Sequence, residues 1–309
     1  MNKVSLYLVA LHLLFLAEAP PARAQAGNAG MTFLKLGVSG RGVGMGDAMA
    51  GHVSAAAATY YNPAGVLADP STNSGSQLMF MHKEWIQDTR TEFLGASLPL
   101  GSDDALGFSL NTMTVSGIEV RTRPGPPDGT FTSRDLALGV SYARGLSEDL
   151  RVGLTAKYLY EKIFIDETSG YAFDLGAQYK TPIENLSIGA AAANLGRVNG
   201  YRGGTLTLPA LVRIGPAYSG ESQSMHAVST LAIDLLYIFP ERHTYVNAGG
   251  EIVFNRMLAV RAGYEAGSQG RGLSGGVGLQ YGILALDYAF ARLSADLGDT
   301  HTISLSLNL

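Results

Sequence analysis

The chain has 309 residues, enough for one large domain or two ordinary ones, and only 16% of them are charged. It contains no cysteine, which excludes a disulfide framework and a thiolate metal site, and its net charge of −4 gives no electrostatic footprint for nucleic acid. The 39 glycines and the slightly positive mean hydropathy are typical of a chain that spreads its apolar residues over many strands.

Residues 1–26 predict a secretory signal peptide. Lys3 provides the positive start, an apolar run extends from Val4 to Leu16, and "PPARAQA" then offers small residues at the A-x-A spacing of a cleavage site. An N-terminal membrane anchor is the alternative, but the run is short and ends in prolines. No later run reaches about 18 apolar residues. The exported protein is therefore expected to be soluble or to cross a membrane as strands.

The stretch "AAAATYYNPAG", residues 55–65, predicts a short helix that ends abruptly in a confined space. Its four alanines can pack closely against a wall, and two tyrosines follow them. The residue before a proline is disfavoured in the helical region, so Asn62 and Pro63 are expected to end the helix. Gly65 then restores backbone freedom.

The rest of the chain alternates apolar residues with small or polar ones at a period of two. Clear examples are "VGLTAKYLY" at 152–160, "LAVRAGY" at 258–264 and "TISLSLNL" at 302–309. Such alternation over strands of about ten residues predicts an all-β fold, a transmembrane antiparallel β-barrel. A soluble β-sandwich is the alternative, but sandwich strands are shorter, at about 5–6 residues.

Fourteen strands are predicted, an even number as expected for a bacterial single-chain barrel. Short turns, such as 101–104 and 282–283, alternate with mostly longer connections, such as 115–133 and 196–208, which is the pattern of periplasmic turns and outer loops. The predicted strands are 76–84, 90–99, 105–114, 134–145, 150–164, 171–180, 186–195, 209–219, 225–237, 244–254, 258–266, 272–281, 284–293 and 301–309.

Two turns predict the register of their hairpins. A two-residue turn at Gly282-Ile283 favours type II′ and pairs Tyr281 with Leu284 on the lipid face. A three-residue loop at 255–257 pairs Phe254 with Leu258. That second register places Glu251 directly opposite Arg261, with both side chains facing inward.

Seven charged residues fall on inward positions and form a predicted lumen lining. Positive and negative groups alternate around the wall, without the large single-sign field of an ion-selective pore. A satisfied lining in which each charge pairs with a neighbour is therefore preferred to a solute or ion path. The seven residues are Lys157, Asp174, Arg213, Asp234, Glu251, Arg261 and Asp287.

The segment 33–67 resembles the N-terminal region of the PorV/PorQ family of outer-membrane proteins, a branch of the FadL-like barrels. Its motifs are a Phe-Leu-Lys start, a Gly-Arg-x-x-Gly-Met-Gly turn and an aromatic-Asn-Pro-Ala-Gly motif. They occupy Phe33, Leu34 and Lys35; Gly40, Arg41, Gly44, Met45 and Gly46; and Tyr61, Asn62, Pro63, Ala64 and Gly65, with Tyr60 just before. The similarity continues through "GLTAKYLY" and "FDLGAQY" to the C-terminal strands and covers nearly the whole mature chain.

The resemblance implies that residues 27–75 form a plug, or hatch, inside a barrel formed by residues 76–309. Ala55 to Ala58 would pack against the wall, and Tyr60 and Tyr61 would wedge the segment in place. The chain departs from the usual pattern at its last residue, because outer-membrane barrels usually end in an aromatic residue and this one ends in Leu309. That departure weakens the assembly signal slightly but does not remove it.

Two functions follow from the resemblance, both at the outer membrane of a Gram-negative bacterium. One is a component linked to type IX secretion that binds secreted cargo or other parts of the secretion machinery. The other is a FadL-like channel that takes fatty acids, detergent or other hydrophobic small molecules into the barrel. Inward positions are mostly small or charged, which favours the secretion role. Outer-membrane lipid and the barrel-assembly machinery are expected partners in both cases, and nucleic acid is not.

No catalytic or metal-binding pattern is found, so we expect neither an enzyme nor a cofactor. The spacing Gly270-x-Gly272-x-x-Gly275 matches a dinucleotide fingerprint but opens a strand rather than a helix. The histidines lack zinc-binding spacing, and His226 and Ser229 point to opposite faces of their predicted strand.

Overall fold

The computed structural model describes residues 29–68, 75–86, 88–201, 204–268, 270–294 and 298–309. The signal peptide predicted for residues 1–26 lies outside the described residues. The predicted boundary between plug and barrel, at residue 75, adjoins a stretch that is also outside them, so this division stays a prediction. Within the described residues, no helix combines the length and the apolar character needed to cross a membrane.

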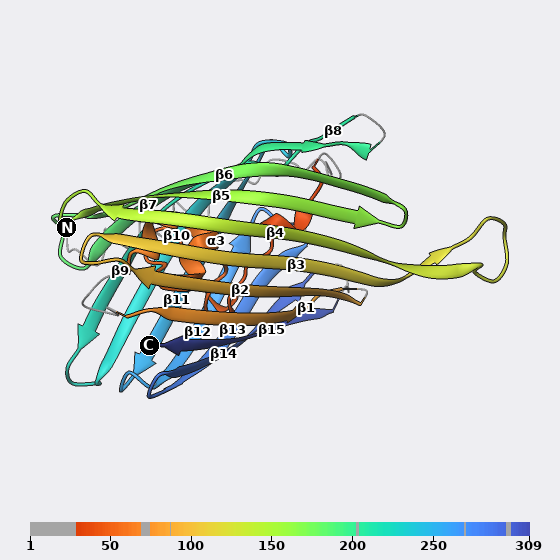
Figure 1. Cartoon of the computed structure of the whole chain (residues 1–309). Helices are drawn as coiled ribbons and strands as arrows, with labels where there is room; N and C mark the ends of the chain where they lie inside the picture. Colours follow the sequence, from red (N-terminus) through yellow and green to blue (C-terminus); the bar gives the residue numbers. More distant parts are fainter. Residues whose placement is uncertain (1–28, 69–74, 87, 202–203, 269, 295–297) are drawn as a thin grey trace.

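The wall of the molecule is one antiparallel sheet that closes into a barrel, as predicted (Figure 1). Each wall strand pairs with the wall strands next to it in sequence, with β7 pairing to β9 past the short β8, and β1 pairs with β15 to close the ring. The two-residue β8 pairs with β7 alone in the described part of the chain, so fourteen of the fifteen strands form the wall. The strands are β1 (Gln77–Glu84), β2 (Thr89–Pro99), β3 (Asp104–Val120), β4 (Gly129–Gly145), β5 (Leu150–Ile163), β6 (Asp166–Lys180), β7 (Leu186–Asn199), β8 (Thr205–Leu206), β9 (Leu211–Ser222), β10 (Ala227–Ile238), β11 (His243–Phe254), β12 (Leu258–Ala266), β13 (Arg271–Tyr281), β14 (Leu284–Leu293) and β15 (Asp299–Asn308).

The two predicted hairpin registers are confirmed. Tyr281 pairs with Leu284, and Gly282 has a φ of 58°, as the first central residue of a type II′ turn requires. Across the other turn, Phe254 pairs with Leu258, and Glu251 lies opposite Arg261. Turn chemistry therefore sets the register here, since a slip of one residue would turn every apolar side chain inward.

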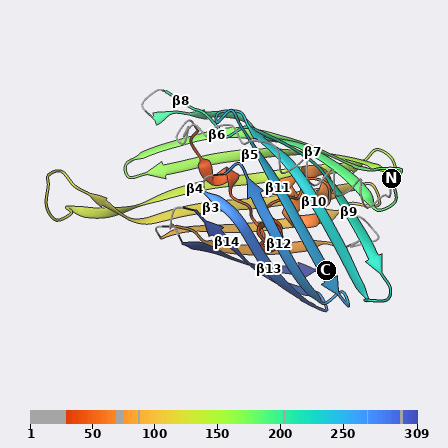
Figure 2. The same ribbon diagram turned by 180° about the vertical axis from the view of Figure 1, so that it is seen from behind.

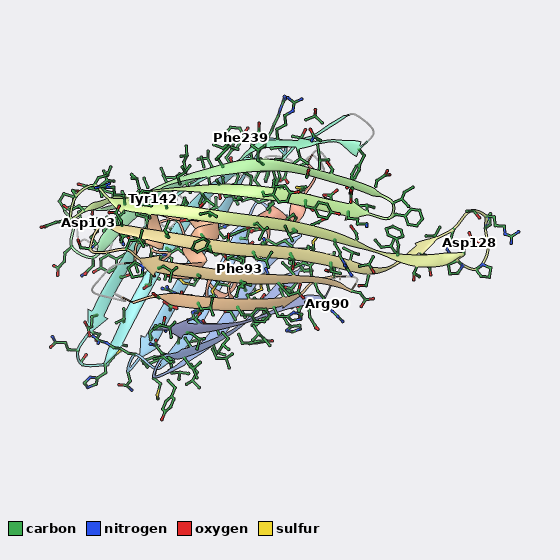
Figure 3. The ribbon with its side chains drawn as sticks, viewed as in Figure 1. Arg90, Phe93, Asp103, Asp128, Tyr142 and Phe239 are labelled. Atoms are coloured by element: carbon green, nitrogen blue, oxygen red, sulfur yellow. The ribbon has the colours of Figure 1, made fainter. Side chains whose placement is uncertain are left out.

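The prediction that residues 115–133 form an outer loop is wrong in extent. Most of it continues the two strands, so β3 and β4 form a hairpin that extends beyond the rest of the barrel (Figure 1), with Asp128 near its tip (Figure 3). The connection between β5 and β6 is also shorter than predicted, because β6 begins at Asp166 rather than at residue 171. Alternation reports which face a strand buries, and a strand that leaves the barrel buries neither face, so its sequence carries no such signal.

The outer face of the barrel is apolar and the inner face is mixed. Leucine, phenylalanine and tyrosine side chains on alternate positions are exposed, as at Phe80, Leu231 and Tyr264, while the positions between them are buried. This arrangement is expected for strands that contact lipid on one side and a filled lumen on the other. A soluble sandwich would bury the large apolar side chains instead.

Residues 29–68 fill the inside of the barrel as a chain of short helices (Figures 1 and 2). Ala56 and Ala58 belong to the main buried cluster and Ala57 packs against it. The helix α3 ends at Tyr61, just before Asn62, whose backbone is extended. The elements are η1 (Thr32–Lys35), α2 (Gly40–Gly44), η2 (Ala55–Ala57), α3 (Ala58–Tyr61) and η3 (Pro63–Val66).

Candidate functional site: the plug and the lumen wall

Asn62 ends one plug helix, starts the next and ties both to the barrel. Its Oδ1 accepts from the Ala64 N–H at 3.2 Å, which caps η3. Its Nδ2 donates to Ala50 O at 2.9 Å within the plug and to Ala177 O at 3.0 Å on β6. The residue is fully buried, so all of these bonds are sheltered from water. Asn62 of the Asn-Pro-Ala-Gly motif thus connects two plug segments to each other and to the barrel wall.

The residues after Asn62 fit against glycines of the wall. A Cβ added at Gly153 on β5 would lie 2.3 Å from the Pro63 backbone, and one at Gly176 on β6 would lie 2.1 Å from the Asn62 side chain. Inside the plug, a Cβ at Gly65 would lie 2.2 Å from the Val53 carbonyl oxygen. Glycine is required at these positions by close approach of the backbone.

Tyr61 and Asp47 form the polar centre of the plug. The Tyr61 hydroxyl donates to Asp47 Oδ1 at 2.5 Å and accepts from the Val38 N–H at 3.2 Å. Arg271 of β13 donates to Asp47 Oδ2 at 2.7 Å. Burial by itself raises the pKa of the Asp47 carboxyl, but Arg271 and Lys83 outweigh burial and hold that pKa below its usual value. Burial and the Asp47 charge raise the pKa of Tyr61.

The predicted glycine turn, residues 40–46, forms α2 and the bend after it, and it presses against the strands β12 to β15. Ser39 caps α2 by accepting from the Gly42 N–H at 3.0 Å. Met45 is fully buried, and a Cβ at Gly249 would lie 2.2 Å from its carbonyl oxygen. Gly46 has a φ of 63° and lies against the backbone of β12, so it needs both the conformation and the size of glycine.

Arg41 on α2 enters a charge network on the wall. Its guanidinium donates to Glu251 at 2.8 Å, and Glu251 also accepts from Arg261 at 2.5 Å. Arg261 reaches Asp287 at 2.7 Å. The predicted pair of Glu251 and Arg261 is therefore present, but it is part of a four-residue chain whose first member belongs to the plug.

Arg213 and Asp234 hold the plug by its backbone. Arg213 donates to the carbonyl oxygen of Asp47 at 3.0 Å. Asp234 Oδ2 accepts from the N–H groups of Met49 at 2.7 Å and Ala50 at 2.8 Å. Two lining charges thus bind plug peptide groups.

Lys157 and Asp174 have a different role, since they brace an irregularity of the wall. The register between β6 and β7 shifts at Asp174, opposite Asn194, which has a φ of 60°. Asp174 Oδ1 accepts from the Asn194 N–H at 2.8 Å, and Lys157 lies 2.7 Å from Asp174 Oδ2 and 2.8 Å from Asn194 Oδ1. The three side chains stabilise a β-bulge from the lumen side.

All seven predicted lining residues thus point into the lumen. Five of them, Arg213, Asp234, Glu251, Arg261 and Asp287, bind the plug directly or belong to the charge network that does. Sequence reasoning missed their partner Asp47 and the wall cations Arg271 and Lys83, of which Lys83 contacts the Gly37 carbonyl oxygen. Asp47 comes directly after Gly46, the last residue of the glycine turn, and this position is the feature of the sequence that could have identified it. Within the described residues, no group of three or more His, Cys, Asp or Glu side chains could hold a metal ion.

The first helical turn of the plug is held by apolar contacts. We call residues 31–36 the outer plug segment, because they lie toward the end of the barrel that carries the β3–β4 hairpin, and residues 37–67 the inner plug segment. Met31, Phe33 and Leu34 are at most 3% exposed. They pack on a set of wall and loop side chains that we call the apolar patch: Met113, Ala137, Leu159, Ala172, Val198, Leu206 and Leu208.

The apolar patch qualifies the expectation that inward positions are mostly small or charged, because it adds a group of large apolar side chains to the lumen. Leu159 and Val198 are fully buried and face inward. Leu159 occupies an inward position of "VGLTAKYLY". The large outward residues of this strand establish the alternation, so a single apolar residue on the inward face does not stand out. Among the described residues, few side chains make polar contacts with the outer plug segment: the Tyr60 hydroxyl donates to Leu34 O at 3.0 Å, and the partly exposed Lys35 contacts Glu241.

Two hollows lie on either side of the wall at the middle of β2 to β5. A cavity of about 20 Å³ inside the barrel is lined by Leu34, Tyr60, Phe93 and Asn111, among others; Figure 3 shows Phe93 midway along the wall. An apolar groove of about 680 Å³ lies on the lipid-facing side. Both hollows are lined by Ser109, Gly139 and Lys157, and the groove also by large side chains including Leu94, Phe108, Leu138, Tyr158 and Phe173.

Comparison with known proteins finds similarity at the level of structure. No family model matches the sequence, and no curated protein matches it. The fold is similar to the toluene transporter TodX of Pseudomonas putida, with a TM-score of 0.65 and 14% identity over 88% of this chain and 98% of that one. It is also similar to the monoaromatic hydrocarbon channel CymD, with a TM-score of 0.63 and 15% identity over 88% and 98% of the two chains.

A FadL homologue of Pseudomonas aeruginosa matches with a TM-score of 0.53 and 12% identity, again over 88% of this chain and 98% of that chain. These three neighbours are described as a transporter, a channel and a FadL homologue, and none of them as a secretion component. The comparisons therefore give the PorV/PorQ relationship no support of its own and lie closer to the FadL-like alternative. At such low identity the likeness concerns the fold: the chain has the fold of an outer-membrane β-barrel of the FadL type.

Proposed function

We propose that this protein admits small hydrophobic molecules through the outer membrane of a Gram-negative bacterium, with the outer plug segment as its gate. The observation that carries the proposal is the way the lumen is closed. Apolar side chains of Met31, Phe33 and Leu34 fill the apolar patch, while the segment behind them is anchored by charges. The likeness to channels for toluene and other monoaromatic hydrocarbons supports the same role.

The route that we propose enters from the end with the β3–β4 hairpin and displaces the outer plug segment. The next space along that route is the cavity beside Tyr60. The small inward residues Gly95, Ser109 and Gly139 lie in one row of the wall beyond it, and the apolar groove lies on their other side. The hydrogen-bonded register is continuous along this row, so lateral exit requires that these strands separate.

Toluene uptake by cells that express the protein tests this proposal. The variant Phe33→Ala should raise the uptake rate, because it loosens the gate without touching the charged anchors. Phe80→Ala is the matched control, since Phe80 faces outward from β1 and is 48% exposed. Equal uptake by the wild type, both variants and cells without the protein would overturn the proposal. The protein should fractionate with the outer membrane and run faster on gels unboiled than boiled.

A role in type IX secretion is the second candidate, and the β3–β4 hairpin favours it. Within the described residues, the ribbon from Ser116 to Phe131 pairs with no further strand on either side, because the pairing of β3 with β2 stops at Val115 and that of β4 with β5 stops at Arg134. Free strand edges on a projecting arm suit binding to another protein. Shortening the arm to a tight turn should abolish surface display of cargo if this role is real, and should leave toluene uptake unchanged.

A further inference from the structure

One buried amide in the lumen has no partner. Asn111 lies on β3, faces inward and is only 4% exposed. Neither its amide nitrogen nor its amide oxygen has a hydrogen-bond partner among the described residues. Buried polar groups are nearly always paired, and an unpaired one is unfavourable, so this amide calls for an explanation.

The Asn111 amide borders the internal cavity, and other polar side chains line the same cavity. Ser109, two residues earlier on the same face of β3, lines the same cavity, as do Tyr60 and Leu34 of the plug. With about 20 Å³, the cavity has room for one water molecule or one hydroxyl group. An amide can donate and accept, so it suits a group that does either.

The cavity offers no free charge. Lys157 also lines it, but its ammonium group lies 2.7 Å from Asp174 and 2.8 Å from Asn194, so its charge is already compensated. A carboxylate placed in the cavity would find no cation available to it, and burying such a charge without a partner is very unfavourable. The chemistry of the cavity therefore favours an uncharged group.

The apolar patch begins beside the amide. Asn111 pairs with Ala137 across β3 and β4, and Ala137 pairs with Leu159 across β4 and β5. Both partners belong to the apolar patch on which Phe33 packs. A ligand that takes the place of the Phe33 ring would therefore have the amide of Asn111 next to its apolar body.

We infer that this part of the lumen binds a molecule with an apolar body about the size of one ring and an uncharged hydrogen-bonding group, and that Asn111 selects for that group. Aromatic alcohols and amides belong to this class, whereas plain hydrocarbons and carboxylates do not. The inference rests on the proposed displacement of the outer plug segment, and it adds a preference that a purely apolar channel would lack.

The test compares three probes of similar shape: benzyl alcohol, toluene and benzoate. Their affinities for the purified full-length mature Phe33→Ala protein are measured in detergent, with partition into protein-free micelles subtracted. Benzyl alcohol should bind more tightly than toluene, and benzoate should not bind. Adding Asn111→Leu should weaken benzyl alcohol binding by about three- to tenfold, the usual effect of one hydrogen bond, and leave toluene binding unchanged.

Asn247→Leu is the matched control. Asn247 on β11 is also an inward asparagine, is 1% exposed and has both amide atoms unpaired in the described structure, but it does not line the cavity. Its replacement should not change the preference for benzyl alcohol. Heat-modifiable mobility on gels checks that each variant folds, and Asn111→Ala replaces Asn111→Leu if the latter does not fold.

Two outcomes separate this inference from the proposed passage. If Asn111→Leu weakens benzyl alcohol and toluene equally, or if Asn247→Leu has the same effect as Asn111→Leu, the inference is wrong even where uptake by cells follows Phe33. If the preference for benzyl alcohol depends on Asn111 but Phe33→Ala does not change uptake by cells, the inferred binding site is supported and the proposed passage through the barrel is wrong.

Discussion

The inner and the outer plug segments occupy the same lumen, but buried charges anchor the inner one alone. The inner segment packs in the main apolar cluster and is also bound through charge: Asp47 to Arg271, Arg41 to Glu251, and the peptide groups of Met49 and Ala50 to Asp234. The outer segment relies on the apolar contacts of Met31, Phe33 and Leu34. The ion pair of this segment among the described residues, between Lys35 and Glu241, is partly exposed and so stabilises little.

The difference decides which segment can act as a gate. Removing one member of a buried charge pair leaves the other charged in a low dielectric, so the inner segment is costly to release. Apolar contacts are non-directional, and a hydrophobic ligand of similar size can replace them with little net loss. Such a ligand therefore competes with the outer segment but has no equivalent way to displace the inner one.

The largest effect is expected from Asp47→Ala, which breaks the anchoring of the inner segment. Arg271 would lose its closest partner, and the loss of a buried partner costs about 3–5 kcal/mol. The plug should then leave the lumen in part of the molecules, and conductance across planar bilayers should rise well above that of the wild type. An Asp47→Ala barrel with wild-type conductance would show that charge does not hold the plug.

The next largest effect is expected from Phe33→Ala, which acts on the outer segment alone. Truncating a buried phenylalanine costs about 3 kcal/mol at the low end of the usual range, which corresponds to about a hundredfold in exposure of the segment. Because the chain has no cysteine, Leu34→Cys provides a single thiol whose maleimide labelling rate reports that exposure.

The matched reporter for that experiment is Val53→Cys in the inner segment, a position that is 1% exposed. Phe33→Ala should accelerate labelling at residue 34 and leave labelling at residue 53 unchanged. Parallel acceleration at both sites would mean that the plug moves as one body, and the distinction between the two segments would be lost.

A smaller effect is expected from Arg41→Gln. Glu251 would keep its contact with Arg261, so no buried carboxylate is left without a partner. Arg41 is about one-third exposed, and the loss should therefore be about 1 kcal/mol. Thermal unfolding in detergent should show a small shift, whereas Glu251→Gln, which leaves two arginines without that carboxylate, should show a larger one.

The smallest effect is expected from acid. The pKa of Asp47 is held below its usual value by Arg271 and Lys83 against the effect of burial. A lowered pKa stabilises the folded form above the unfolded value of about 3.9, and this stabilisation is lost as pH falls through the folded value. Conductance should therefore increase as the pH is lowered from 5 to below about 4. Asp47→Asn should reduce this dependence, and the Glu251 carboxylate, which binds Arg41 of the plug, should account for the remainder.

The repeating parts of the fold could be predicted from the sequence. Period-two alternation located all fourteen wall strands, and the turns at Gly282 and at residues 255–257 set the registers that the structure has. The arm formed by β3 and β4 was missed, because strands outside the barrel have no face to bury and show no alternation. The helix stop at Asn62 was predicted because proline restricts the residue before it.

The site was only partly predictable, for a reason that the lining charges illustrate. Alternation shows that Arg213 and Asp234 point inward, but it cannot show that their partners are peptide groups of residues 47, 49 and 50. The apolar patch was missed because its members come from six strands and one loop position, one residue from each. Asn111 gave no signal at all, since a lone inward asparagine is ordinary until its surroundings are known.

Local rules therefore determined what the sequence by itself could specify: strand positions, the face that each side chain takes, hairpin registers and the end of the plug helix. These depend on dihedral preferences and on the pleat, which act between residues close in the chain. Tertiary structure alone decided which charges meet across more than 200 positions, as Arg41 and Glu251 do, and where apolar side chains gather inside the barrel. Closure of the wall around the plug creates those contacts, and no segment of the chain contains them before the barrel closes.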